Sequence, residues 1–121
     1  MKKIVVLILI CCLIGCEEIL YEEDITTDSV SLLAPTNGVS LVIGDVTFNW
    51  QTVNGATGYE LQVATPSFEN AQQIVLDTIV SRVSFTQLLG ANRYEWRLKA
   101  LNSAYETEYT TNGFEIISAE P

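Results

Sequence analysis

Apolar and polar residues alternate along much of the chain after Asp28. The alternation is clearest at 46–50, 59–63 and 94–100. A period of two residues indicates strands that bury one face and leave the other in solvent. Turn-forming pairs such as Asn54-Gly55 separate these stretches, and no segment carries a convincing helical stripe. The pattern therefore predicts an all-β domain.

The predicted strands are short and regularly spaced, which is typical of a β-sandwich. The 39–43 segment is either a strand of its own or an extension of the first strand. The strands are expected at 29–34, 39–43, 46–51, 58–65, 73–77, 80–86, 93–102 and 107–117.

Counting alternate positions predicts a core rich in aromatic side chains. The expected inward residues are Val46, Phe48, Trp50, Tyr59, Leu61, Val63, Val83, Phe85, Leu88, Tyr94, Trp96, Leu98, Phe114 and Ile116.

Three features of this core resemble the fibronectin type III family. Trp50 lies where that family has its second-strand tryptophan, and Tyr59 begins the third strand. Leu88 stands six residues before Tyr94, as in the family's tyrosine corner, although Gly90 replaces the usual proline. The resemblance covers about 29–117. It implies an immunoglobulin-like or fibronectin type III-like β-sandwich of about seven strands, in which the Tyr94 hydroxyl bonds the chain just before its strand.

The N-terminus has the features of an export signal. Two lysines precede the apolar run 4–14, which is too short to span a bilayer. The sequence Leu13-Ile14-Gly15-Cys16 resembles the lipobox of bacterial lipoproteins. The resemblance implies cleavage between Gly15 and Cys16 and attachment of lipid to Cys16, which would make the membrane a partner. The alternatives are an ordinary signal peptide or an uncleaved anchor.

This interpretation divides the chain into a signal peptide (1–15), a lipidated acidic tether (16–28), the sandwich (29–117) and a C-terminal tail (118–121). Because the tether is strongly acidic and without a clear period, we expect a solvated, extended spacer. The residues Glu17-Glu18 loosely resemble a signal of some Gram-negative lineages for the outer face of the outer membrane. The alternative is a lipid anchor in the outer membrane with the domain facing the periplasm.

Charge and composition exclude several classes of function. The formal charge is −9 and becomes −11 if Lys2 and Lys3 are removed with the signal, so no nucleic-acid partner is expected. The chain has no histidine, and its three cysteines all lie within the first sixteen residues. Without a histidine or a cysteine in the body, no nucleophilic triad or zinc cluster is available. We expect no enzyme, no cofactor and no metal.

The expected function is therefore protein binding, adhesion or spacing by a non-catalytic outer-membrane or surface lipoprotein. The alternative is an accessory carbohydrate-binding lipoprotein of a glycan-uptake system. Tyr105 and Tyr109, near the last loop, are candidate contacts for an unknown protein or glycan. The alternative is that Tyr109 only packs at a strand edge and Tyr105 only covers the loop. Arg97 and Lys99 are expected to form cross-strand pairs with nearby acids.

Overall fold

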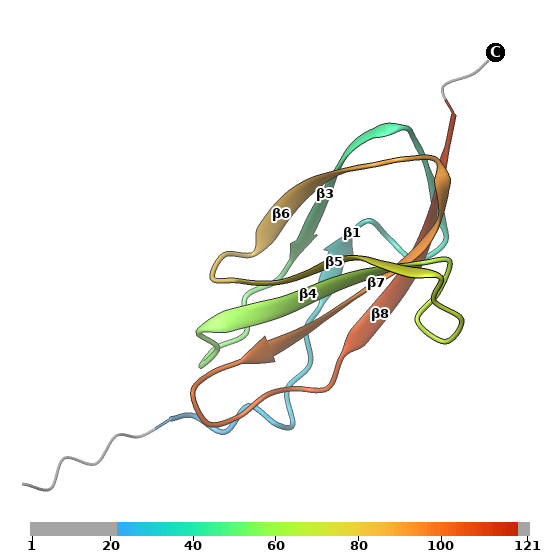
Figure 1. Ribbon diagram of the computed structural model, residues 1–121. Coiled ribbons are helices and arrows are strands. Elements are labelled where there is room, and N and C mark those ends of the chain that lie inside the picture. Colours follow the sequence, from blue (N-terminus) through green and yellow to red (C-terminus); the bar gives the residue numbers. More distant parts are fainter. Residues whose placement is uncertain (1–21, 119–121) are drawn as a thin grey trace, which may run out of the picture.

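The computed structural model of the protein describes residues 22–118, which form a β-sandwich of eight strands and, within that range, no helix. The strands form two layers, and the described chain enters and leaves at opposite ends of the sandwich (Figure 1). The strands are β1 (Leu32–Ala34), β2 (Val39–Val42), β3 (Gly44–Trp50), β4 (Gly58–Thr65), β5 (Gln73–Val80), β6 (Ser84–Leu89), β7 (Asn92–Leu101) and β8 (Thr110–Ile117).

The two layers are a three-stranded sheet of order β1-β3-β6 and a five-stranded sheet of order β2-β8-β7-β4-β5. Strand β2 is a strand of its own and pairs parallel with β8, whereas β1 pairs antiparallel with β3 in the other sheet. The chain crosses between the sheets at a turn where the Gly38 amide donates to the Gly113 carbonyl at 2.7 Å. Gly38 has a φ of 85°, which a glycine adopts without steric strain.

The predicted strand boundaries agree best where the alternation is clearest. The 58–65 prediction coincides with β4, and β7 begins and ends one residue before its predicted range. In contrast, β5 continues to Val80 and β6 begins only at Ser84, four residues after the predicted start. The intervening turn contains Ser81 and Arg82 but no Gly, Pro or Asn, so no turn signal marks it.

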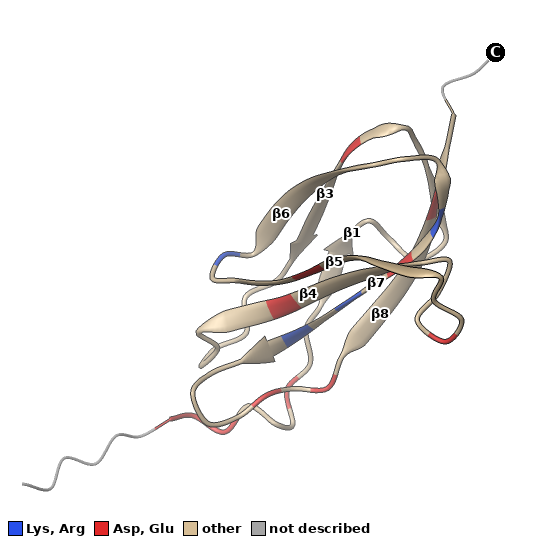
Figure 2. Cartoon of the chain, viewed as in Figure 1, with Lys and Arg blue, Asp and Glu red and all other residues tan. Residues whose placement is uncertain are grey.

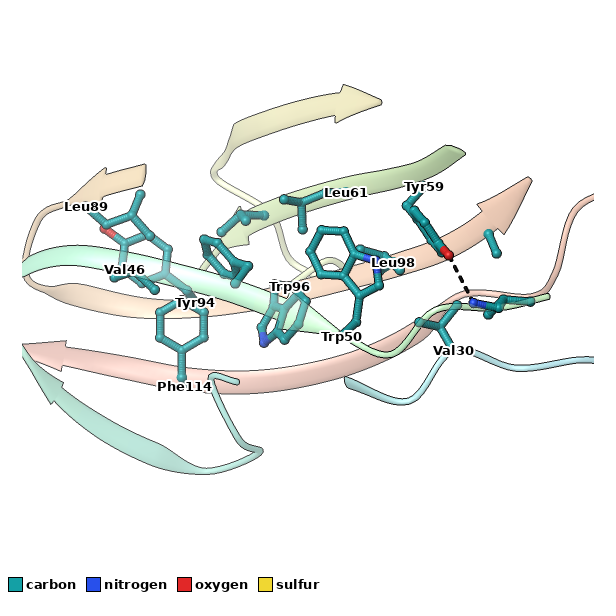
Figure 3. Close-up of a cluster of buried hydrophobic side chains, with 14 of the residues drawn as sticks. Val30, Val46, Trp50, Tyr59, Leu61, Leu89, Tyr94, Trp96, Leu98 and Phe114 are labelled. Atoms are coloured by element: carbon teal, nitrogen blue, oxygen red, sulfur yellow. Dashed lines mark hydrogen bonds between the residues drawn. The ribbon is translucent and has the colours of Figure 1, made fainter. Parts of the chain in front are cut away.

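Aromatic side chains fill the space between the sheets (Figure 3). The Phe48 ring meets the Trp96 ring edge-on at 5.0 Å, and Trp50 lies 5.7 Å from Tyr59. Such pairs add roughly 0.5–1.5 kcal/mol to the stabilisation from burial. The predicted core positions are buried, apart from Val83 and Phe85, which are partly buried against the core, and Leu88.

The prediction for Leu88 was wrong, because its side chain is 66% exposed. Strand β6 alternates so that Phe85, Gln87 and Leu89 face inward and Leu88 faces outward. Leu89 takes the buried position in front of Tyr94. The tyrosine corner itself is present, since the Tyr94 hydroxyl donates to the Gly90 carbonyl at 2.8 Å.

The described part of the predicted tether is not a solvated spacer. Residues 22–30, here called the strap, lie along one end of the sandwich, and Ile25 is 0% exposed. Val30 is buried in the same core, while the acids between Glu22 and Asp28 stay at the surface. The physical reason is that one isolated isoleucine fills the core at this end, and its acidic flanks remain in solvent.

Hydrogen bonds to Asn102 and Ser103, just beyond β7, hold the strap. The Asn102 side-chain amide donates to the carbonyls of Glu23 at 2.8 Å and Gly55 at 3.0 Å. The Glu22 carboxylate accepts from the hydroxyl and the backbone amide of Ser103. Gly55 permits this approach, because a Cβ there would lie 2.8 Å from the Glu23 carboxylate. The packed domain therefore begins before Asp28, the residue at which the sequence predicted the tether to end.

Candidate binding surface

The outer face of the five-stranded sheet carries most of the positive charge of the described chain. The inward residues of β7 are Tyr94, Trp96, Leu98 and Ala100, so the intervening Arg93, Arg97 and Lys99 face outward. The only other cation of residues 22–118 is Arg82, in the turn between β5 and β6 (Figure 2). An acidic domain thus presents three of its four described cations on one strand.

The pairing register arranges the side chains of this face in rows across the strands. One row runs from Asp77 on β5 through Gln62 on β4 to Arg97 on β7. The next row runs from Ile79 through Glu60 to Lys99. Ile79 is 62% exposed, and Ile74 is exposed near the other end of β5. The surface therefore combines charged residues near its centre with aliphatic residues on its outermost strand.

Arg97 lies between two aromatic rings. Its guanidinium carbon is 4.1 Å from the centre of the Phe68 ring and 4.2 Å from that of Tyr109. Its Nε donates to Gln62 Oε1 at 2.8 Å. Phe68 comes from the loop after β4 and is held by its backbone amide, which donates to the Glu95 carboxylate at 2.9 Å. Three separate parts of the chain thus fix the plane of the guanidinium.

Lys99 forms an ion pair with Glu106 at 3.0 Å. Burial alone would lower the pKa of Lys99, but the hydrogen bond with Glu106 and the electrostatic interactions with Tyr109, Glu106 and Glu60 together raise it. The prediction of cross-strand charge pairs is therefore right only in part. Lys99 stands opposite Glu60 but contacts Glu106 of the following loop, and Arg97 pairs across the strands with the neutral Gln62.

The two candidate tyrosines lie in different environments. Tyr109 is half-buried, and its hydroxyl donates to the Glu60 carboxylate. Burial and this hydrogen bond raise the pKa of Tyr109. Its ring already contacts two cations, because Lys99 Nζ is 4.7 Å from its centre. Tyr105 is 37% exposed, and its backbone amide donates to the Asn102 side chain. A ligand contact by either tyrosine stays a prediction.

A hollow of about 310 Å³ lies beside the arginine stack, the name used here for Arg97 with the rings of Phe68 and Tyr109. The hollow is nearer the end of the sheet where β7 begins. Pro66 supplies apolar wall, and Arg93, Glu95 and Glu115 supply charged groups. Glu95 links the hollow to the stack, because it also holds the Phe68 amide. Sequence reasoning missed this arrangement, since Phe68, Arg97 and Tyr109 belong to separate segments and only the fold brings them together.

Several predictions concern other kinds of site. Gly15 and Cys16 lie outside the described residues, so the lipidation site stays a prediction. Within residues 22–118, no helix has the length and apolar character needed to cross a bilayer. The same stretch contains no group of three or more acidic, cysteine or histidine side chains placed to hold a metal ion.

Known proteins are similar to this chain in structure rather than in sequence. No protein-family model and no curated protein matches it. A fibronectin(III)-like module of CbhA from Clostridium thermocellum superposes with a TM-score of 0.56 at 10% identity, over 75% of this chain and 99% of the module. The fn3 domain of human collagen alpha-1(XX) chain superposes with a TM-score of 0.59 at 18% identity, over 77% and 86%. These likenesses confirm the fibronectin type III-like fold.

Proposed function

We propose that this protein is a non-catalytic lipoprotein of the cell envelope, held to the outer membrane through Cys16, with a sandwich that binds a protein partner. The observation that carries the binding role is the ordered outer face of the five-stranded sheet. Arg97 is fixed there between Phe68 and Tyr109 in an otherwise acidic domain. The fibronectin type III-like fold agrees with a binding or spacer module, although fold alone does not define function.

The strap limits the distance between the proposed lipid anchor and the sandwich. Five residues separate Cys16 from Glu22, and Glu22 is bonded to the sandwich through Ser103. A fully extended chain covers at most ~3.3–3.6 Å per residue, so these six steps reach no more than about 22 Å. The end of the sandwich that carries the strap is therefore placed near the lipid. The outer face of the five-stranded sheet stands at the side of the domain, where a partner in the envelope can reach it.

Membrane fractionation of cells that express the full chain tests the anchor. Wild type is expected in the membrane fraction, and Cys16→Ser in the soluble fraction, because the serine hydroxyl cannot form the thioether. Cys12→Ser is the matched control and should leave the protein in the membrane. A Cys16→Ser protein that stays membrane-bound would contradict the lipid anchor. Protease treatment of intact cells then distinguishes an outward-facing from a periplasm-facing domain.

The carbohydrate alternative depends on a free aromatic face. Tyr109 offers less of one than the sequence suggested, because Arg97 and Lys99 already contact its ring. Tyr105 is the more exposed of the candidate pair. Affinity gels with immobilised glycans, run with wild type and Tyr105→Ala, test this alternative. Retardation of wild type that Tyr105→Ala abolishes would favour it over protein binding.

A further inference from the structure

The terminal amino groups of Arg97 are unoccupied donors within the described chain. Nε is bonded to Gln62, whereas Nη1 and Nη2 have no hydrogen-bond acceptor among residues 22–118. The flanking rings of Phe68 and Tyr109 hold the guanidinium in place. An arginine fixed in this way has already lost much of the side-chain freedom that binding would otherwise remove.

The neighbouring carboxylates are each occupied by a different donor. Glu95 accepts from the Phe68 amide, Glu60 from the Tyr109 hydroxyl, and Glu106 from Lys99. Asp77 is in the same row as Arg97 but two strands away, roughly 10 Å at the usual strand spacing. The Lys99–Glu106 pair is the only ion pair of the described residues. Arg97 is thus a positive charge without a carboxylate of its own.

The geometry points to Arg97 as the receptor for a carboxylate of a protein partner that docks on the outer face of the five-stranded sheet. A guanidinium matches the two oxygens of a carboxylate through parallel N–H···O bonds. The acids around Arg97 disfavour a highly charged anion such as a polyphosphate. The exposed Ile74 and Ile79 supply apolar contact for a protein surface. This inference rests on the proposed binding function and names the chemistry that the partner must present.

Photo-cross-linking in the native host tests this inference on the full chain. Replacing Ile79 by p-benzoylphenylalanine places the probe on the proposed surface, and replacing Leu88, which is exposed on the other sheet, provides a control position. We expect a protease-sensitive adduct from position 79 that Arg97→Gln reduces about tenfold or more, because loss of one partner of a close charge pair mainly speeds dissociation. Arg82→Gln is the matched charge control and should leave the adduct unchanged.

A second variant separates recognition from folding. Arg97→Lys keeps a cation over the two rings but lacks the planar fork, so we expect an adduct yield between those of wild type and Arg97→Gln. Circular dichroism of the purified variants shows whether the sandwich is intact. Mass spectrometry of the adduct locates the partner segment, where replacing its Asp or Glu by Asn or Gln should lower the yield as Arg97→Gln does.

Three outcomes would overturn the inference. These are an Arg97→Gln variant that keeps the full yield from position 79, an adduct that consists of glycan, and the absence of any adduct from position 79. Fractionation of the same strains keeps this result apart from the anchor. A membrane-bound chain without the adduct overturns the Arg97 receptor alone, whereas a wild-type chain in the soluble fraction overturns the lipid anchor.

Discussion

The two ends of the sandwich are closed in different ways. At the end that carries the strap, residues 22–30 cover the core and bury Ile25 completely. At the far end, Val42, Ile43 and Ile117 are 61%, 46% and 47% exposed, although the backbones there are paired. One end of the sandwich is thus covered by the strap, a segment that its acidic composition predicts to be exposed to solvent. At the other end, aliphatic side chains are left uncovered.

The largest expected difference between the ends comes from truncating one isoleucine at each. Ile25→Ala should destabilise the protein by about 2–4 kcal/mol, because it removes a fully buried side chain and leaves a cavity. Ile43→Ala removes the same atoms from a half-exposed position and should cost less than about 1 kcal/mol. Urea unfolding of both variants measures the contrast. Equal losses would show that the strap does not contribute to the cooperative core.

The next largest effect concerns the asparagine that attaches the strap. Asn102→Ala removes two donors to the carbonyls of Glu23 and Gly55, and the acceptor for the amides of Ala104 and Tyr105. Because Asn102 is 8% exposed, several polar groups lose their partner, and we expect a loss of about 1–3 kcal/mol.

The control for Asn102 lies at the far end. Asn92 is exposed, and its side chain accepts from the neighbouring Arg93 amide at 2.8 Å. Asn92→Ala should therefore cost well under 1 kcal/mol, since water can replace the lost contact. Hydrogen exchange of the full chain shows the location of each effect. Asn102→Ala should increase exchange in the strap, and Asn92→Ala should not.

The same contrast explains what the sequence could predict. Strict alternation allowed β4 and most of β7 to be predicted, because apolar residues recur at every second position of a strand with one buried face. The strap has no such repeat. Ile25 stands alone among acidic and hydroxyl residues, so composition predicted a solvated spacer, and only the open end of the core explains why it is buried.

Only the charged residues of the candidate binding surface could be predicted from the sequence. Alternation along β7 is enough to identify Arg97 and Lys99 as outward residues, because they occupy its odd-numbered positions. Their partners could not be predicted, because Phe68 and Tyr109 come from loops whose path depends on the whole fold. The misplacement of Leu88 has a simpler cause. Two adjacent leucines fit opposite faces of a strand, and the spacing to Tyr94 favoured the wrong one.

A smaller effect compares the two tyrosine hydroxyls that fix loops at the two ends. At the strap end, Tyr59 accepts from the buried Val53 amide at 3.0 Å (Figure 3). Tyr59→Phe leaves that amide without a partner and should cost about 1–2 kcal/mol. At the far end, Tyr94→Phe should cost about 0.5–1 kcal/mol, because the Gly90 carbonyl is exposed enough to bond water. Denaturant unfolding that gave the reverse order would contradict this assignment.

The smallest predicted effect is the pH dependence of the strap. The hydrogen bonds from the Ser103 hydroxyl and backbone amide lower the pKa of Glu22 in the folded protein below its ordinary value of 4.5. The unfolded chain therefore binds more protons near that pH, and the contribution of Glu22 is present above it and lost as the pH falls through the folded pKa. The Glu22 carboxylate lies at the surface of the domain, so solvent screening keeps the effect small.

Thermal unfolding between pH 7 and pH 3 measures this dependence. Glu22→Gln should lower the midpoint at neutral pH, and the difference from wild type should shrink as the pH falls. Ser103→Ala removes the larger of the two hydrogen bonds, so adding Glu22→Gln to it should change the midpoint less. If Glu22→Gln shifts the midpoint equally at every pH and in both backgrounds, the carboxylate does not attach the strap. The strap would then be attached only by the burial of Ile25 and by the hydrogen bonds of the Asn102 amide. These contacts alone would explain why the core is covered at this end of the sandwich and not at the far end.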